Sequence, residues 1–190
     1  EIGGGAFADC TSLTSVVISS SVTEIGKNAF PGCASLTSII VEEGNSVYDS
    51  REGCNAIIET ATNKLIQGCN STFIPSSVIA IGRDAFNGCT SLTSVVIPEG
   101  VTEIGEIAFS GCTSLTSIEI PSSVIAIGCY AFDGCTSLTS VVIPEGVTEI
   151  GFRAFFDCSS LTSVVIPSSV TKIERFAFSG CTSLTSIVIP

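Results

Sequence analysis

Residues 92–114 read LTSVVIPEGVTEIGEIAFSGCTS, and this stretch decides how the chain folds. Its apolar residues Leu92, Val95 and Ile97 follow the spacing L-x-x-L-x-L. Because successive side chains of a strand point to opposite faces, we expect these three residues to point inward and the residues between them to point outward. Pro98 lacks a backbone donor and is expected to end the strand. The stretch therefore opens with a short strand that buries one face.

The second half of the stretch turns the chain back on itself. Val101 and Ile104 bracket a second short extended segment, and Gly105 is expected to permit the next bend. Ala108 and Phe109 follow as an apolar wedge, which we expect inside the molecule on a short helical or 3₁₀ turn. One such unit cannot bury its own apolar face, so it needs copies of itself on either side.

Cysteine marks the recurrence of this unit along the chain. The residues Cys89, Cys112, Cys135, Cys158 and Cys181 are spaced by 23 residues, and Cys10 and Cys33 share that spacing. A fixed period between about 20 and 50 residues is typical of a solenoid. Eight copies of the main strand end at Ile18, Val41, Ile74, Ile97, Ile120, Ile143, Ile166 and Ile189.

These copies predict one solenoid over residues 1–190, with about eight repeats of 23 residues, one of them lengthened at 42–74. Parallel strands joined by crossovers wind right-handed, so we expect a right-handed coil, mostly β, with a parallel concave sheet. Successive coils should stack their apolar residues in a single hydrophobic column. The chain starts inside a repeat at Glu1, and we interpret it as a piece of a longer protein.

The repeated unit resembles the BspA-like, or Treponema-type, leucine-rich repeats of bacterial surface proteins. The matching pattern is L-T-S-V-V-I-P-x-x-V-T-x-I-G-x-x-A-F-x-x-C, which recurs with small changes everywhere except near residues 42–70. The resemblance implies a leucine-rich-repeat solenoid. It also implies a secreted or cell-surface protein that adheres to host or neighbouring-cell proteins.

The lengthened repeat carries a segment that departs from the pattern. Residues 55–60 and 64–69 are predicted to form two strands of a β-hairpin insert, with Asn63 in a left-handed conformation in the loop between them. The resemblance implies such a variant repeat as well. The insert is either a protruding contact loop or a structural elaboration that fills one side of the solenoid. The second interpretation is favoured because apolar residues such as Ile57 and Leu65 need burial.

The ten cysteines raise the question of disulfides. Equivalent positions on successive coils point the same way, so the seven cysteines of the period are predicted to form a buried row of free thiols. Cys54 and Cys69 lie near opposite ends of the predicted hairpin, and a bridge between them is left open. Cys129 falls at a variable position and is expected to be a partly exposed free thiol.

Composition restricts the chemistry and the partners. Acidic residues outnumber basic ones 18 to 7, giving a formal charge of -11 and no basic patch, which argues against nucleic acid as a partner. The chain has no histidine, so it lacks His-based nucleophile pairs and His metal sites. No apolar run approaches the roughly 18 residues of a membrane span, so we expect no direct membrane insertion in this segment. We therefore predict no enzymatic activity, no metal and no cofactor.

Two surfaces are candidates for binding an extracellular protein. The first is the outward row of the main strands, an apolar strip rimmed by serines, and its members are Val17, Ile40, Phe73, Val96, Glu119, Val142, Val165 and Val188. Exposed apolar patches usually mark interaction sites, although β-branched residues also suit any strand. The second surface comprises the variable residues before A-F, among them Arg83, Tyr130, Phe152, Arg153 and Phe176, which are interface types or products of drift.

The leading hypothesis is a non-enzymatic protein-binding module that mediates adhesion at the cell surface or outside the cell. One alternative is a structural spacer or stalk, which the uniformity of the repeats favours. Another is an engineered repeat scaffold, because residues 75–120 and 121–166 are near duplicates. Uncovered core at the two ends of a solenoid would also permit end-to-end self-association.

Overall fold

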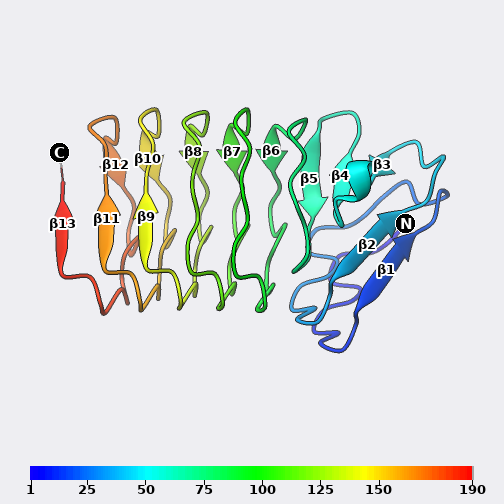
Figure 1. Ribbon diagram of the computed structural model, residues 1–190, viewed down its shortest axis with the longest axis horizontal. Helices are drawn as coiled ribbons and strands as arrows, with labels where there is room; N and C mark the ends of the chain where they lie inside the picture. The colour runs from blue at the N-terminus through cyan, green and yellow to red at the C-terminus, as the bar shows by residue number, and fades with distance from the viewer. Residues whose placement is uncertain (190) are drawn as a thin grey trace.

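The computed structural model describes residues 1–189 and has the shape of a stack of about eight coils (Figure 1). The coils follow one another along the long axis of the molecule, and short strands of neighbouring coils pair side by side. The solenoid predicted from the 23-residue period is confirmed.

The main strands pair in parallel and in register, but they form two separate sheets. The strands are β1 (Ser15–Ile18) with β2 (Ser38–Val41), and β9 (Ser140–Val142), β11 (Ser163–Val165) and β13 (Ser186–Val188). Single parallel bridges from Val96 to Glu119 and from Ser117 to Ser140 extend the second group. Residues 71–74, expected as the third main strand, are in no strand or bridge of the described chain. The expected single stack of main strands is therefore interrupted at the lengthened repeat.

The second segments form the longest sheet. Its order is β12-β10-β8-β7-β6-β5-β4-β3, with parallel pairing from β5 to β12 and antiparallel pairing in the insert. The strands are β3 (Tyr48–Asp49), β4 (Ile57–Glu59), β5 (Lys64–Gln67), β6 (Ala80–Ile81), β7 (Glu103–Ile104), β8 (Ala126–Ile127), β10 (Glu149–Ile150) and β12 (Lys172–Ile173). The predicted hairpin corresponds to β4 and β5, and Asn63 has the expected left-handed φ of 50°. The sequence did not predict β3 or the 3₁₀ turn at Arg51–Gly53.

Phenylalanine rings fill the interior in a regular column. Phe86, Phe109, Phe132 and Phe155 are all fully buried, and each ring stacks on the next with centroids 4.9–5.3 Å apart. Such offset aromatic stacks add to the free energy gained by burying the rings. The apolar wedge predicted inside the molecule is confirmed.

The A-F segment consists of consecutive hydrogen-bonded turns rather than a regular helix. The residue before each A-F pair adopts a left-handed conformation, with φ of 61° at Ile107, 57° at Tyr130 and 54° at Arg153. A left-handed residue ends any helical run. This residue turns the backbone so that the phenylalanine amide bonds to the neighbouring coil, as in the bond from Phe109 N to Ala131 O at 2.7 Å.

The glycine after each second strand is required by close packing. A Cβ atom on Gly105, Gly128 or Gly151 would lie 2.6–2.8 Å from backbone atoms of the preceding coil. Non-bonded carbon atoms pack at about 3.5–4.0 Å, so only glycine permits this spacing. The expected role of Gly105 in bending the chain is thus replaced by a role in coil-to-coil contact.

All ten cysteines are free, and five of them hold adjacent coils together. Cys33, Cys112, Cys135, Cys158 and Cys181 each donate from Sγ to the carbonyl oxygen of a phenylalanine in the preceding coil, at 3.2–3.3 Å. Burial raises the pKa of the Cys135 thiol to about 12, so it stays protonated and able to donate. Cys54 and Cys69 are buried and unbridged, and Cys129 is partly exposed as predicted. Of the seven cysteines predicted to be buried, Cys10 is exposed and Cys181 is only partly buried, because each lies in an end coil of the described residues.

The insert divides the core in two, which corrects the expected single column. Adjacent residues of β4 point to opposite sides, so that Ile57 packs in a small N-terminal cluster and Ile58 in the large remaining cluster. In Figure 1, β1 and β2 are inclined to the coils that follow β5. β4 therefore separates the two hydrophobic clusters of the stack.

Candidate functional site

The outward row of main-strand residues is exposed along the whole molecule. Exposure is 61% at Val17, 80% at Val96, 61% at Val142, 57% at Val165 and 76% at Val188. Ile40, Phe73 and Glu119 are exposed as well. Large apolar side chains with this exposure leave an unfavourable surface in water, which binding of a partner would cover.

The strands position these side chains by alternation. Val141 and Ile143 on either side of Val142 are each 2% exposed, so they anchor the strand to the core while Val142 points away from it. The pairing register places Val142, Val165 and Val188 directly beside one another. The backbone thus lines these valines up in a continuous row.

Threonines hold the coils of this face in register. The Oγ1 atoms of Thr116, Thr139 and Thr162 donate to the carbonyl oxygen of the equivalent threonine one coil earlier, at 3.0–3.3 Å. Each of these bonds fixes one coil against the next at the start of the main strand. The row of outward side chains is consequently presented on a rigid frame.

The row is interrupted at the insert. Val17 pairs with Ile40 on β1 and β2, whereas Phe73 lies on the unpaired residues 71–74. The Nδ2 atom of Asn70 donates to the carbonyl oxygens of Ala34 and Leu36 at 2.8 and 3.1 Å, which holds the chain on the β2 coil just before this segment. We define the strip as the five neighbouring residues Val96, Glu119, Val142, Val165 and Val188.

Glu119 breaks the apolar character of the strip and lies beside a shallow hollow. The hollow has a volume of about 350 Å³ and is lined by residues of two neighbouring coils, including Ser117, Glu119, Ser140 and Val142. A carboxylate here can accept hydrogen bonds from a partner, and the flanking serine hydroxyls can donate or accept. The strip therefore combines an apolar contact surface with one place for polar recognition.

A cluster of aromatic rings around Arg153 forms a second, partly exposed feature. Its guanidinium carbon lies 4.4 Å from the ring centroid of Phe156 and 5.5 Å from those of Phe152 and Phe176. Rings of Tyr130, Phe152 and Phe176 meet edge-on at 5.2–6.0 Å. The sequence singled out the variable positions, but the contacts between their side chains depend on the spacing of the coils. Phe156 was missed because it lies after the A-F pair.

The described residues also bear on metal binding and on membrane insertion. Within residues 1–189, no set of three or more His, Cys, Asp or Glu side chains comes together in a way that could hold a metal ion. Over the same residues, no helix has the length and apolar character needed to cross a membrane.

Known proteins are similar to this chain in sequence and fold. The family model of the BspA type leucine rich repeat region matches residues 1–63 and 59–185, in six copies. A leucine rich cell surface protein from Faecalibacterium prausnitzii is 38% identical, with a TM-score of 0.85 over 97% of this chain and 50% of its own. A leucine-rich repeat protein from Eubacterium ventriosum is 28% identical, with a TM-score of 0.81 over 94% of this chain and 49% of its own.

A third similar solved structure is the leucine rich repeat protein of T. pallidum. It is 30% identical, with a TM-score of 0.63 over 96% of this chain and 70% of its own. The chain spans about half the length of the Faecalibacterium and Eubacterium structures. No curated protein matches the chain significantly.

Proposed function

We propose that this chain, which belongs to the BspA type leucine-rich repeat family, is a protein-binding module of a bacterial surface protein and has no catalytic activity. The observation that carries the proposal is the strip, whose valines are 57–80% exposed, while the strand neighbours of Val96, Val142 and Val165 are buried. The similar protein from Faecalibacterium prausnitzii is described as a cell surface protein, which supports a location outside the cell.

The strip suits a partner that binds through shape and many weak contacts. Its residues lie on a backbone fixed by coil-to-coil hydrogen bonds, so little conformational entropy is lost when a partner docks. The net charge of -11 disfavours acidic partners and favours proteins with a neutral or basic surface. We propose that adhesion to proteins of a host or of neighbouring cells is the biological role.

The test compares two variants with the unaltered chain. The triple variant Val96→Lys, Val142→Lys, Val165→Lys places three charges on the strip. Its control, Ile79→Lys with Ile125→Lys, alters residues that are 48% and 60% exposed on the second segments. Binding to a panel of purified extracellular matrix and plasma proteins is measured by biolayer interferometry, and circular dichroism checks the fold of each variant.

We expect the strip variant to lose at least about tenfold in affinity for any protein bound by the unaltered chain, because charged groups must be desolvated on docking. The control should bind as the unaltered chain does. Equal binding by the strip variant would assign recognition to another surface.

The alternative of a structural spacer is favoured by the uniform pairing of the coils. In that case the isolated chain binds nothing on the panel, whereas an adhesin binds at least one member.

A further inference from the structure

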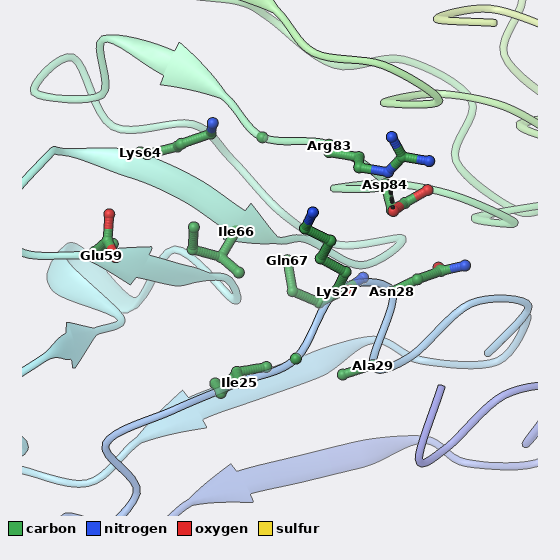
Figure 2. A pocket seen from close by; sticks show the side chains of 12 residues that line it. Ile25, Lys27, Asn28, Ala29, Glu59, Lys64, Ile66, Gln67, Arg83 and Asp84 are labelled. Atoms are coloured by element: carbon green, nitrogen blue, oxygen red, sulfur yellow. Dashed lines mark hydrogen bonds and ion pairs between the residues drawn. The ribbon is translucent and has the colours of Figure 1, made fainter. Parts of the chain in front are cut away.

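A cavity lies where the insert replaces one of the regular loops. In the regular coils each A-F loop stacks on the next, but between the loops at Ala29 and Ala85 the place of one loop is taken by β5. The two loops contact each other after their A-F pairs, where Gly32 N donates to Asn87 O at 3.4 Å. Before the A-F pairs they leave a space of about 280 Å³, which Figure 2 shows from close by.

Cationic side chains are concentrated around this space. Lys27, Lys64 and Arg83 line it, although the whole chain of 190 residues has only seven basic residues. Figure 2 shows Lys27 extending from its loop into the space between β5 and the Arg83–Asp84 loop. Within residues 1–189 neither Lys27 nor Lys64 forms an ion pair, whereas Arg83 pairs with Asp84 and Glu106. Two ammonium groups are therefore available to an anion.

Other parts of the wall can accept hydrogen bonds. Asp84 is 4% exposed, and its Oδ1 atom is buried without a hydrogen-bond partner among residues 1–189. Its Oδ2 atom accepts from Arg83 at 3.2 Å. The Glu59 carboxylate also lines the space, on the side opposite Asp84. A buried acceptor without a partner costs free energy, which a donor supplied by a ligand would recover.

Part of the remaining wall is apolar, and Asn28 and Gln67 complete the lining. Ile25 and Ile66 face the space beside Gly26 and Gly82, so part of a ligand must present carbon rather than oxygen. The Cε atom of Lys64 lies 3.3 Å from the position of a Cβ atom on Gly82, so the lysine stem packs along the backbone there. The cavity thus combines two cations, two acceptors and one apolar patch.

We propose that this cavity is a binding site for a carboxylated sugar, such as a uronic acid residue of a glycan. The carboxylate would bind Lys27 and Lys64, hydroxyl groups would donate to Asp84 and Glu59, and the apolar face of the ring would lie against Ile66. An inorganic anion would leave the acceptors and the apolar patch unused, and a neutral sugar would leave the two lysines unused.

The proposal is tested by titrating the chain with glucuronate in isothermal calorimetry or by ligand-observed NMR. Glucose supplies the same ring and hydroxyls without the charge, and inorganic phosphate supplies the charge without the ring. We expect glucuronate to bind at least about tenfold more tightly than either. Glucose lacks the carboxylate that would form charge-assisted hydrogen bonds with the lysines, and phosphate lacks the sugar ring and its hydroxyl groups.

The variant Lys27→Gln with Lys64→Gln should weaken glucuronate binding by about tenfold or more. Lys172→Gln is the matched control, because Lys172 is exposed and pairs with Glu149 and Glu174 far along the chain. Undiminished binding by the double variant would overturn the proposal, and so would equal affinity for glucuronate and phosphate, or no binding of glucuronate at all. Strip variants should leave glucuronate binding unchanged, so the two proposals fail independently.

Discussion

At the scale of single residues, glycine sets the distance between coils. Gly105, Gly128 and Gly151 stand in line, and each leaves no room for a methyl group against the backbone of the coil before it. Glu174 takes the equivalent position in the last coil, where it is half-buried. No further coil among the described residues packs beyond it, so this coil can move outward. The constraint is therefore strict only for inner coils.

The variant Gly128→Ala is expected to lower the free energy of unfolding by about 2–3 kcal/mol, because the new methyl group must push apart two packed coils. Its ideal Cβ position lies 2.6 Å from the carbonyl carbon of Gly105. Denaturant unfolding followed by circular dichroism measures the change. Gly3→Ala is the control, since a Cβ atom there meets nothing within 4 Å, and it should have little effect. Equal stability of the two variants would refute the packing argument.

Some residue roles could be predicted from the sequence and others could not. Alternation along the strands correctly gave the exposed Val142 and the buried Val141. The left-handed conformation of Ile107 could not be predicted, because β-branched residues disfavour it and only the neighbouring coil enforces it. Cys10 was misplaced because the repeat pattern treats every coil as having a neighbour on both sides, whereas Cys10 lies in the first coil of the described residues.

At the scale of elements, the insert fastens the N-terminal coils to the rest of the molecule. The Tyr48 hydroxyl of β3 accepts a hydrogen bond from the Ile25 amide at 3.1 Å, and the Ser50 hydroxyl accepts one from the Val41 amide at 2.9 Å. The insert thus satisfies donors that the next regular coil would otherwise have satisfied. This arrangement supports the interpretation of the insert as a structural elaboration.

The variant Tyr48→Phe is expected to destabilise the N-terminal coils by about 1–2 kcal/mol, because it leaves the Ile25 amide without its acceptor. Tyr48 is only 6% exposed, so water cannot easily replace the lost hydroxyl. Hydrogen exchange of the Ile25 amide, read by NMR, should become faster. The control is Tyr130→Phe, which removes the chain's other tyrosine hydroxyl, a group that makes no hydrogen bond among residues 1–189. Identical exchange in both variants would contradict the assigned role.

The hairpin could be predicted from its two apolar runs and its loop at Asn63, but its consequences could not. That β4 sends Ile57 and Ile58 into different cores depends on how the strand lies across the stack. The cavity beside Lys27 and Lys64 was missed for a similar reason, since it arises from a loop that the insert omits. The exposed strip was predicted residue by residue, whereas its interruption at Phe73 required the coordinates.

At the scale of the whole molecule, the two cores differ greatly in size. The large cluster runs from Cys54 to Ala177, whereas the small one holds residues between Ile18 and Cys69. In a solenoid each coil contacts only its neighbours, so stability is a sum of local terms and need not be lost all at once. The smaller cluster buries less apolar surface and has less to oppose unfolding.

We therefore expect the N-terminal coils to unfold at lower denaturant concentration than the central ones. Hydrogen exchange with mass spectrometry should show peptides that contain β1 and β2 losing protection before peptides that contain Phe109 and Phe132. The reason is that the central coils belong to the unbroken phenylalanine column. Simultaneous loss of protection in both regions would contradict this expectation and show that the two clusters unfold as one cooperative unit.

Between regular coils, the cysteine and threonine side-chain bonds run in one direction, from a later coil back to the carbonyl oxygens of an earlier one. A ribosome releases the chain from its N-terminus, so the accepting oxygens are in place before the hydroxyl and thiol groups that use them emerge. Each newly made coil can therefore form these side-chain bonds with the preceding coil as soon as it emerges.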